Sequence, residues 1–372
     1  MTEMIKCNMT KNLFRLLAPL LFLNQAVVAQ SGWEDTDRRI MALSSDRIES
    51  IGELGWLINQ NFSDDTQKVR AMYVWLAHNI RYDTREMDEL IREETDAEIT
   101  VRTFEKRRGI CEGYAGIMDS LCEIAGITSY MVSGYTRQED QVDPLPHAWI
   151  AAKINDYWYM FDPTWGAGSV VNNRFQKEFD ERYFMVPPST MIRTHMPYDP
   201  IWQFLKFPVN HKDFRLGQTN TATIKTMFAY EDSIRYHLSL SRPERLAQEL
   251  RRIDAAGEDE ALEIRKEYLN QALAVETLNA GIRRFNEATA MYNRGAERYN
   301  DYASLRNKYP NYKPFIDVLE KTLSEAAESF ISVNDILDEA QFTHPDLKRN
   351  ASVLKRNAAN MLRTIEQERK KL

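Results

Sequence analysis

Apolar residues recur every three or four positions through the last quarter of the chain, which is the spacing of one buried helix face. Residues 275–303, 316–340 and 347–365 carry this pattern, and the proline-containing stretches KYPNYKP and FTHPD separate them. Proline in such stretches predicts loops. We therefore expect three long helices, which either fold back on one another as an up-down-up bundle or pair between chains as a coiled coil.

The pattern before residue 170 changes from helical to alternating. Residues 46–60 and 65–80 have helical spacing, and an apolar stripe runs from Cys111 to Gly126, a glycine that predicts the helix end. The segments SYMVSGYTR and HAWIAAKINDYWYMFDPTW are rich in aromatic and aliphatic residues, and the second contains a two-residue turn at positions 155–156. Helices followed by antiparallel strands predict an α+β fold.

The register of the predicted hairpin brings two titratable residues together. A turn at positions 155–156 places Trp149 opposite Asp162 and His147 opposite Thr164. Opposed residues share a face of the sheet, so His147 and Asp162 become diagonal neighbours within side-chain reach. The carboxylate can then bind one imidazole nitrogen and leave the other free, as in a nucleophile–base–orienter triad.

Cys111 is the candidate nucleophile. It begins a predicted helix, where the first-turn N–H groups and the helix dipole favour a thiolate. Taken alone, a cysteine at this position is more often a small buried residue than a nucleophile. A cysteine at a helix start, followed by His147 and Asp162 in register on a hairpin, favours a catalytic role for Cys111. The sequence does not place the other histidines beside a comparable cysteine and carboxylate: His195 and His211 lie in predicted irregular chain, and the rest lie in or beside helices.

Cys122 lies on the same predicted helix as Cys111. Their separation along the helix axis is about 16 Å, whereas a disulfide requires Cα atoms within about 7 Å. We therefore expect two free thiols. Metal-ligand spacings such as H-E-x-x-H and C-x-x-C, and calcium loops such as D-x-D-x-D-G, do not occur in the sequence. We expect neither a metal nor a cofactor.

Three separated blocks, VWLAHNIRYD, GICEGYA and PHAWIAAKINDYWYMFDPTW, resemble the transglutaminase-like superfamily and occur in its order. The continuation through HMPYDPIWQF resembles the bacterial branch related to kyphoscoliosis peptidase. The resemblance covers roughly residues 60–170. It implies a papain-like core in which Cys111 is the nucleophile, His147 the general base and Asp162 its orienter. It implies nothing about the helical tail.

These residues favour acyl transfer through a thioester on Cys111, with a protein or peptide as the substrate. Water accepts the acyl group in a protease or amidase, and an amine accepts it in a protein-glutamine transamidase. Hydrolysis is favoured because an accessible thioester hydrolyses by default. The Cys111 backbone N–H is one expected oxyanion donor, and the second is left open between Trp75 and another nearby polar or aromatic side chain. The alternative is a non-catalytic extracytoplasmic scaffold that uses its core and its heptad helices to bind a protein partner, with self-association through the C-terminal helices as a further option.

The N-terminus predicts export. Basic residues precede the apolar run LLAPLLFL, and small residues precede a cleavage site near Ala29. This run is too short to span a bilayer, so we expect a periplasmic or secreted protein with no stable membrane span. The expected divisions are a signal peptide (1–29), a transglutaminase-like domain (30–216) and a helical domain (217–372). A net charge of −7 argues against a nucleic-acid partner.

Overall fold

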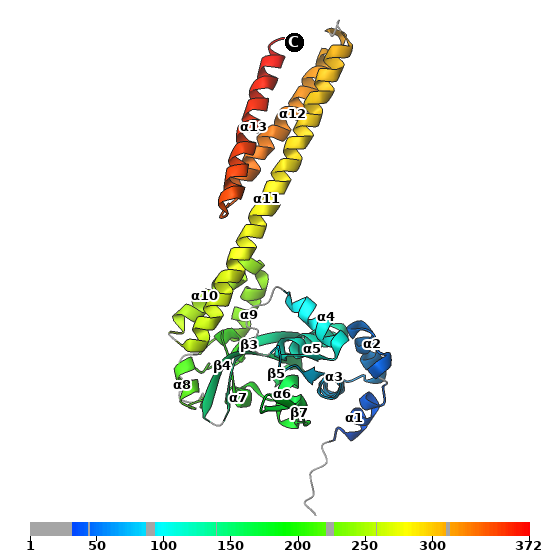
Figure 1. Ribbon diagram of the computed structural model, residues 1–372, viewed down its shortest axis with the longest axis vertical. Helices are drawn as coiled ribbons and strands as arrows, with labels where there is room; N and C mark the ends of the chain where they lie inside the picture. Colours follow the sequence, from blue (N-terminus) through cyan, green and yellow to red (C-terminus); the bar gives the residue numbers. More distant parts are fainter. Residues whose placement is uncertain are drawn as a thin grey trace, which may run out of the picture.

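The computed structural model describes residues 32–43, 45–86, 94–138, 140–220, 227–257, 259–309 and 313–372. The predicted signal peptide lies outside these residues. Figure 1 shows an α+β body from which a long helical arm projects, with the C-terminus at the far end of the arm. Among the helices of the described residues, none combines the length and the apolar character needed to cross a membrane.

Helices form the first part of the body: α1 (Glu34–Met41), α2 (Ile51–Asn61), α3 (Asp65–Asn79), α4 (Asp96–Lys106) and α5 (Cys111–Ala125). Asp64 caps α3, and Thr95 begins α4 with a capping box. As predicted, Gly126 ends α5 in the left-handed conformation, with φ at 74°. Helix α5 contacts α2, α3 and α4 on the helical side and β3 and β4 on the other side, so it forms the centre of the body.

A four-stranded antiparallel sheet packs against α5, in the order β5-β4-β3-β8. Its strands are β3 (Ser129–Gln138), β4 (Gln141–Ile154), β5 (Tyr157–Phe161) and β8 (His195–Pro197). Two smaller ladders join β1 (Arg81–Tyr82) to β2 (Arg108–Gly109), and β6 (Gly168–Val171) to β7 (Arg174–Lys177). Short helices follow the strands: α6 (Pro163–Ala167), α7 (Pro188–Met191) and α8 (His211–Arg215). The α+β prediction is confirmed.

The hairpin forms at the predicted turn. Asn155 and Asp156 both have positive φ, as a two-residue type I′ turn requires, and Ile154 pairs with Tyr157. The predicted register holds up to residue 161. Beyond it the prediction is wrong, because Pro163 has no N–H for the ladder and begins α6. Two predicted pairings therefore do not form: Trp149 with Asp162, and His147 with Thr164.

The C-terminal region consists of α9 (Tyr230–Ser239), α10 (Arg242–Ala255), α11 (Glu260–Lys308), α12 (Ile316–Glu339) and α13 (Pro345–Arg369). The last three share an apolar core within one chain and form the arm of Figure 1. Helix α11 begins earlier than predicted. Its first turns carry Leu262 and Leu269, which pack in the same core as Tyr135 of β3. The base of the arm is thereby fixed to the sheet.

A buried arginine ties separate parts of the body together. Arg70 of α3 has no exposed surface, and its guanidinium donates two hydrogen bonds to Asp37 of α1, at 2.8 and 2.7 Å. A third hydrogen bond, of 2.6 Å, goes to Glu181, which follows β7 in the chain. These ion pairs hold α1 and the segment after β7 against α3.

We predict that Arg70→Ala lowers the free energy of unfolding by about 3 kcal/mol, because it removes a buried guanidinium that pairs with two partly exposed carboxylates and leaves a cavity. Arg235→Ala is the control, since its pair with Asp232 is exposed on both sides and is expected to contribute less than about 1 kcal/mol. Urea denaturation at pH 7 measures both. Equal losses in the two variants would show that the buried network is not what holds these segments.

Candidate active site

Cys111 is the first residue of α5 and borders a cavity of about 810 Å³, although only 5% of its surface is exposed. Close packing of α4 on α5 positions it. A Cβ atom on Gly113 would lie 2.1 Å from Thr103, and one on Gly116 would lie 2.0 Å from Thr100. Only glycine allows this approach, so the GICEGYAG sequence sets where the thiol lies.

His147 of β4 borders the same cavity. Its Nε2 lies 2.8 Å from Oδ2 of Asp162, and an ionised carboxylate only accepts, so His147 donates this hydrogen bond. The ring lies beside Trp165, with the ring centres 5.7 Å apart. Cys111 borders the same cavity as this ring. The structure therefore brings together the three residues singled out from the sequence.

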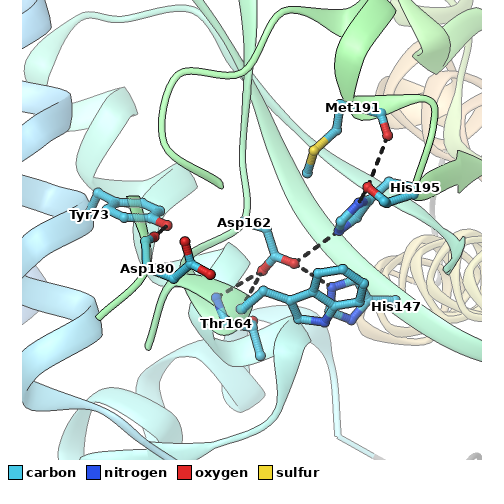
Figure 2. Close-up of polar contacts among 9 residues, drawn as sticks. Tyr73, His147, Asp162, Thr164, Asp180, Met191 and His195 are labelled. Carbon is cyan, nitrogen blue, oxygen red and sulfur yellow. Dashed lines mark hydrogen bonds and ion pairs between the residues drawn. The ribbon is translucent and has the colours of Figure 1, made fainter. Parts of the chain in front are cut away.

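Asp162 is fully buried and caps α6. Its Oδ1 accepts the backbone N–H groups of Thr164 and Trp165, at 2.9 and 3.1 Å. Its Oδ2 accepts from His147 and from a second histidine, His195, at 3.1 Å. Figure 2 shows the carboxylate between the two rings. Four donors offset the cost of burying this charge.

The charges of this group reinforce one another. Burial lowers the pKa of His147, but the charge and hydrogen bond of Asp162, together with Cys111, raise it to about 10. Burial raises the pKa of Asp162, yet the charge and hydrogen bond of His147, together with His195, hold it well below its ordinary range. At neutral pH, His147 and Asp162 therefore form an imidazolium–carboxylate pair.

The sequence analysis missed His195. We expected it in irregular chain, away from the other site residues, and this is wrong. His195 lies on β8, pairs with Thr136 of β3 and is only 1% exposed. No local spacing reveals this contact, since His195 is 33 positions from Asp162. The block HMPYDPIWQF, which belongs to the family resemblance, was the one available signal.

Trp75, our candidate for the second oxyanion donor, is not among the described residues that border the cavity. It stacks on Phe104, with ring centres 5.5 Å apart, beneath the guanidinium of Arg107. Tyr82 does border the cavity, and the β1–β2 ladder holds it opposite Gly109, two positions before Cys111. Burial and the charge of Cys111 raise the pKa of Tyr82, so its hydroxyl stays protonated as a donor.

Both cysteines in the described part of the chain are free, as expected. Cys122 is buried, and its Sγ lies 3.9 Å from the sulfur of Met72. Burial raises the pKa of the Cys122 thiol to about 12. This thiol therefore remains protonated and unreactive at neutral pH, whereas Cys111 faces the cavity.

In the part of the chain that the structure describes, one group has the geometry of a possible metal site: His147, Asp162 and His195, whose ligand-type atoms lie within 4.8 Å of one another. Two imidazoles and a carboxylate are donors that zinc accepts. In this arrangement, however, the carboxylate oxygen already accepts an N–H from each ring. A metal would have to displace both protons, so hydrogen bonding explains the cluster.

The fold and the cavity define an α+β domain with a cysteine at a helix start beside a histidine–carboxylate pair. Residues 57–163 match the family model of the transglutaminase-like superfamily. Residues 57–163 are therefore a transglutaminase-like domain.

Kyphoscoliosis peptidase from Mus musculus is 32% identical over 172 residues, which are 44% of this chain and 26% of that protein. The Homo sapiens protein of the same name is 32% identical over 163 residues, 42% of this chain and 24% of the relative. The chain thus spans about a quarter of these relatives. The solved periplasmic domain of TgpA from Pseudomonas aeruginosa is 24% identical, with a TM-score of 0.26 over 35% of this chain and 47% of that one.

We predict that Asp162→Asn destabilises the protein by an amount that depends on pH. A raised pKa of His147 stabilises the fold fully below the unfolded value of 6.5, and this is lost as pH rises through about 10. A lowered pKa of Asp162 stabilises it above the unfolded value of 3.8, and this is lost in acid. The loss in the variant is therefore largest between about pH 4 and 6.5, at about 3 kcal/mol.

Urea denaturation of both proteins at pH 5, 8 and 10 measures this difference. Asparagine also caps helices well, so the start of α6 is retained in the variant. The same difference in stability at pH 5 and pH 10 would contradict the assigned ion pair.

Proposed function

We propose that this chain is an exported, cysteine-dependent acyl-transfer enzyme that cleaves peptide or carboxamide bonds by hydrolysis. Cys111 is the nucleophile, His147 the acid–base group and Asp162 the residue that orients the ring. One observation carries the proposal: the 2.8 Å hydrogen bond from His147 to a buried carboxylate, on a ring that shares a cavity with Cys111. Export rests on the signal-like pattern of residues 1–29.

The reaction proceeds in two halves. The Cys111 thiolate attacks the carbonyl carbon, and the His147 imidazolium gives its Nδ1 proton to the leaving nitrogen as the C–N bond breaks. In the resulting thioester, neutral His147 takes a proton from water, and the hydroxide formed attacks the carbonyl carbon. The C–S bond then breaks, and the acid leaves. Asp162 stays ionised throughout and holds the ring in one orientation.

The oxyanion of the tetrahedral intermediate needs donors that are already in place. The backbone N–H of Cys111 lies in the first turn of α5, where helical N–H groups lack partners within the helix. We assign the second donor to the hydroxyl of Tyr82, which borders the cavity beside Cys111.

We predict that Tyr82→Phe lowers kcat/KM about 100-fold, the usual cost of removing one oxyanion donor. Tyr183→Phe is the matched control, because Tyr183 also borders the cavity, where its ring packs against Trp165 with ring centres 5.0 Å apart. Hydrolysis rates of both variants on one peptide substrate decide this. Equal effects of the two substitutions would remove Tyr82 from the mechanism.

Several exposed polar side chains border the cavity, including Glu178, Arg182 and Asn173. A thioester on Cys111 is therefore open to water, which favours hydrolysis over transfer to an amine. A transamidase would need this space closed during the second half of the reaction.

We predict that Cys111→Ala abolishes peptide hydrolysis, by at least about 1000-fold, because the bond-forming atom is lost. Folding should change little, since one small side chain replaces another. Cys122→Ala is the control, and it should keep its activity because Cys122 is buried away from the cavity. A protein substrate is incubated with each variant, with and without a labelled primary amine, and the products are analysed by mass spectrometry. New peptide termini measure hydrolysis, and incorporated label measures transfer to the amine.

Each outcome has one meaning. New peptide termini that appear with wild type and Cys122→Ala but not with Cys111→Ala support the proposed hydrolase. Incorporation of the amine that depends on Cys111 would instead identify a transamidase. Wild-type activity in Cys111→Ala would contradict the enzyme and leave a binding scaffold.

A further inference from the structure

The buried carboxylate of Asp162 has a second imidazole partner that the proposed reaction does not use. Nε2 of His195 lies 3.1 Å from the same Oδ2 atom that accepts from His147, and the His195 side chain has no exposed surface (Figure 2). His195 is not among the described residues that border the cavity, so it does not touch a substrate bound there. Any role must act through Asp162.

The hydrogen bonds of His195 fix its tautomer. An ionised carboxylate only accepts, so Nε2 of His195 carries the proton. Burial and the positive charge of His147 lower the pKa of His195 despite the nearby Asp162, so the ring is neutral. Its Nδ1 is then an acceptor, and the hydroxyl of Thr194 lies 2.8 Å from it, closer than the 3.3 Å to its other acceptor, the Met191 carbonyl, so it donates to the ring.

Packing holds the ring as firmly as its hydrogen bonds do. The centre of the His195 ring lies 4.5 Å from that of Trp165 and 5.1 Å from that of Trp149. The backbone of His195 is paired with Thr136 of β3. Strand β3 pairs on its other side with β4, the strand that carries His147. The sheet therefore sets the distance between the two imidazoles, and Asp162 lies between them.

An aspartate carboxylate that can rotate about its Cβ–Cγ bond would lose its alignment with an imidazole ring. Backbone N–H groups hold Oδ1 of Asp162, whereas among the described residues only the two histidines hydrogen-bond to Oδ2. During turnover His147 gives up a proton and takes one back, so the strength of its own bond to Asp162 changes. The His195 bond does not change during these steps and keeps Oδ2 in place.

We propose that His195 is a positioning residue, which uses its Nε2–H to hold the Asp162 carboxylate in line with His147. This inference rests on the proposed function, because it needs His147 and Cys111 to act together. It adds a second histidine, contributed by β8, to the cysteine, histidine and aspartate assigned above.

Two substitutions separate the donor from the shape of the ring. His195→Gln keeps an N–H group that can reach the position of the imidazole Nε2, and His195→Phe keeps the ring volume without a donor. The probe is iodoacetamide, and the reading is the alkylation rate of Cys111 at pH 6.5, followed by peptide mapping of the full chain. Cys122 is the internal control, since its thiol is buried and protonated.

We predict that iodoacetamide alkylates Cys111 about tenfold more slowly in His195→Phe than in the wild type. In His195→Gln the alkylation rate should stay within about threefold of the wild-type rate. A residue that only fills space would leave the rate unchanged in both folded variants or slow both equally. Either of those results would overturn the inference. Because His195→Phe can fail to fold, Thr194→Val provides a second test: it removes the hydroxyl that holds Nδ1 of the His195 ring, and it should also slow the alkylation of Cys111.

Asp162→Asn distinguishes this inference from the proposed function. If Asp162→Asn slows Cys111 but neither His195→Phe nor Thr194→Val does, the positioning role is wrong and the proposed enzyme stands. If Cys111 of the wild type reacts no faster than Cys122, the proposed nucleophile itself is wrong.

Discussion

A single buried negative charge organises the centre of this protein. The carboxylate of Asp162 has no contact with solvent, and it remains ionised because two backbone N–H groups and two imidazoles donate to it. These four donors come from three different parts of the fold. Helix α6 supplies the backbone groups, while strands β4 and β8 supply the histidines. Removing the carboxylate would leave these four hydrogen-bond donors without their acceptor in a buried site.

The fold serves this arrangement by bringing three chain segments to one edge of the cavity. Helix α5 places Cys111 at its first turn, the β4–β5 hairpin brings the chain to Asp162, and Pro163 stops the strand so that Asp162 caps α6. Helix α11 extends from the same body, and its first turns pack beside β3 before the arm begins. The cavity and the arm are therefore built on one sheet.

Local patterns in the sequence predicted what depends on neighbours along the chain. The start and end of α5, the turn at positions 155–156 and the helices of the arm follow from spacing, caps and turn residues. The contact of His147 with Asp162 was also predicted, although through a strand pairing that stops before it. His195 could not be found this way, because its partner strand, β3, lies more than 50 positions away. The position of Trp75 likewise depends on the packing of α3 against α4.

The most direct test of this account is the protonation of the two histidines in the folded protein. Long-range nitrogen–proton NMR spectra of the histidine rings, recorded at pH 7 and assigned with His147→Gln and His195→Gln, report both nitrogens of each ring. We expect His147 as an imidazolium with two N–H protons and His195 as a neutral ring protonated at Nε2. A neutral His147, or an His195 ring protonated at Nδ1 alone, would contradict the ionised carboxylate on which the site depends.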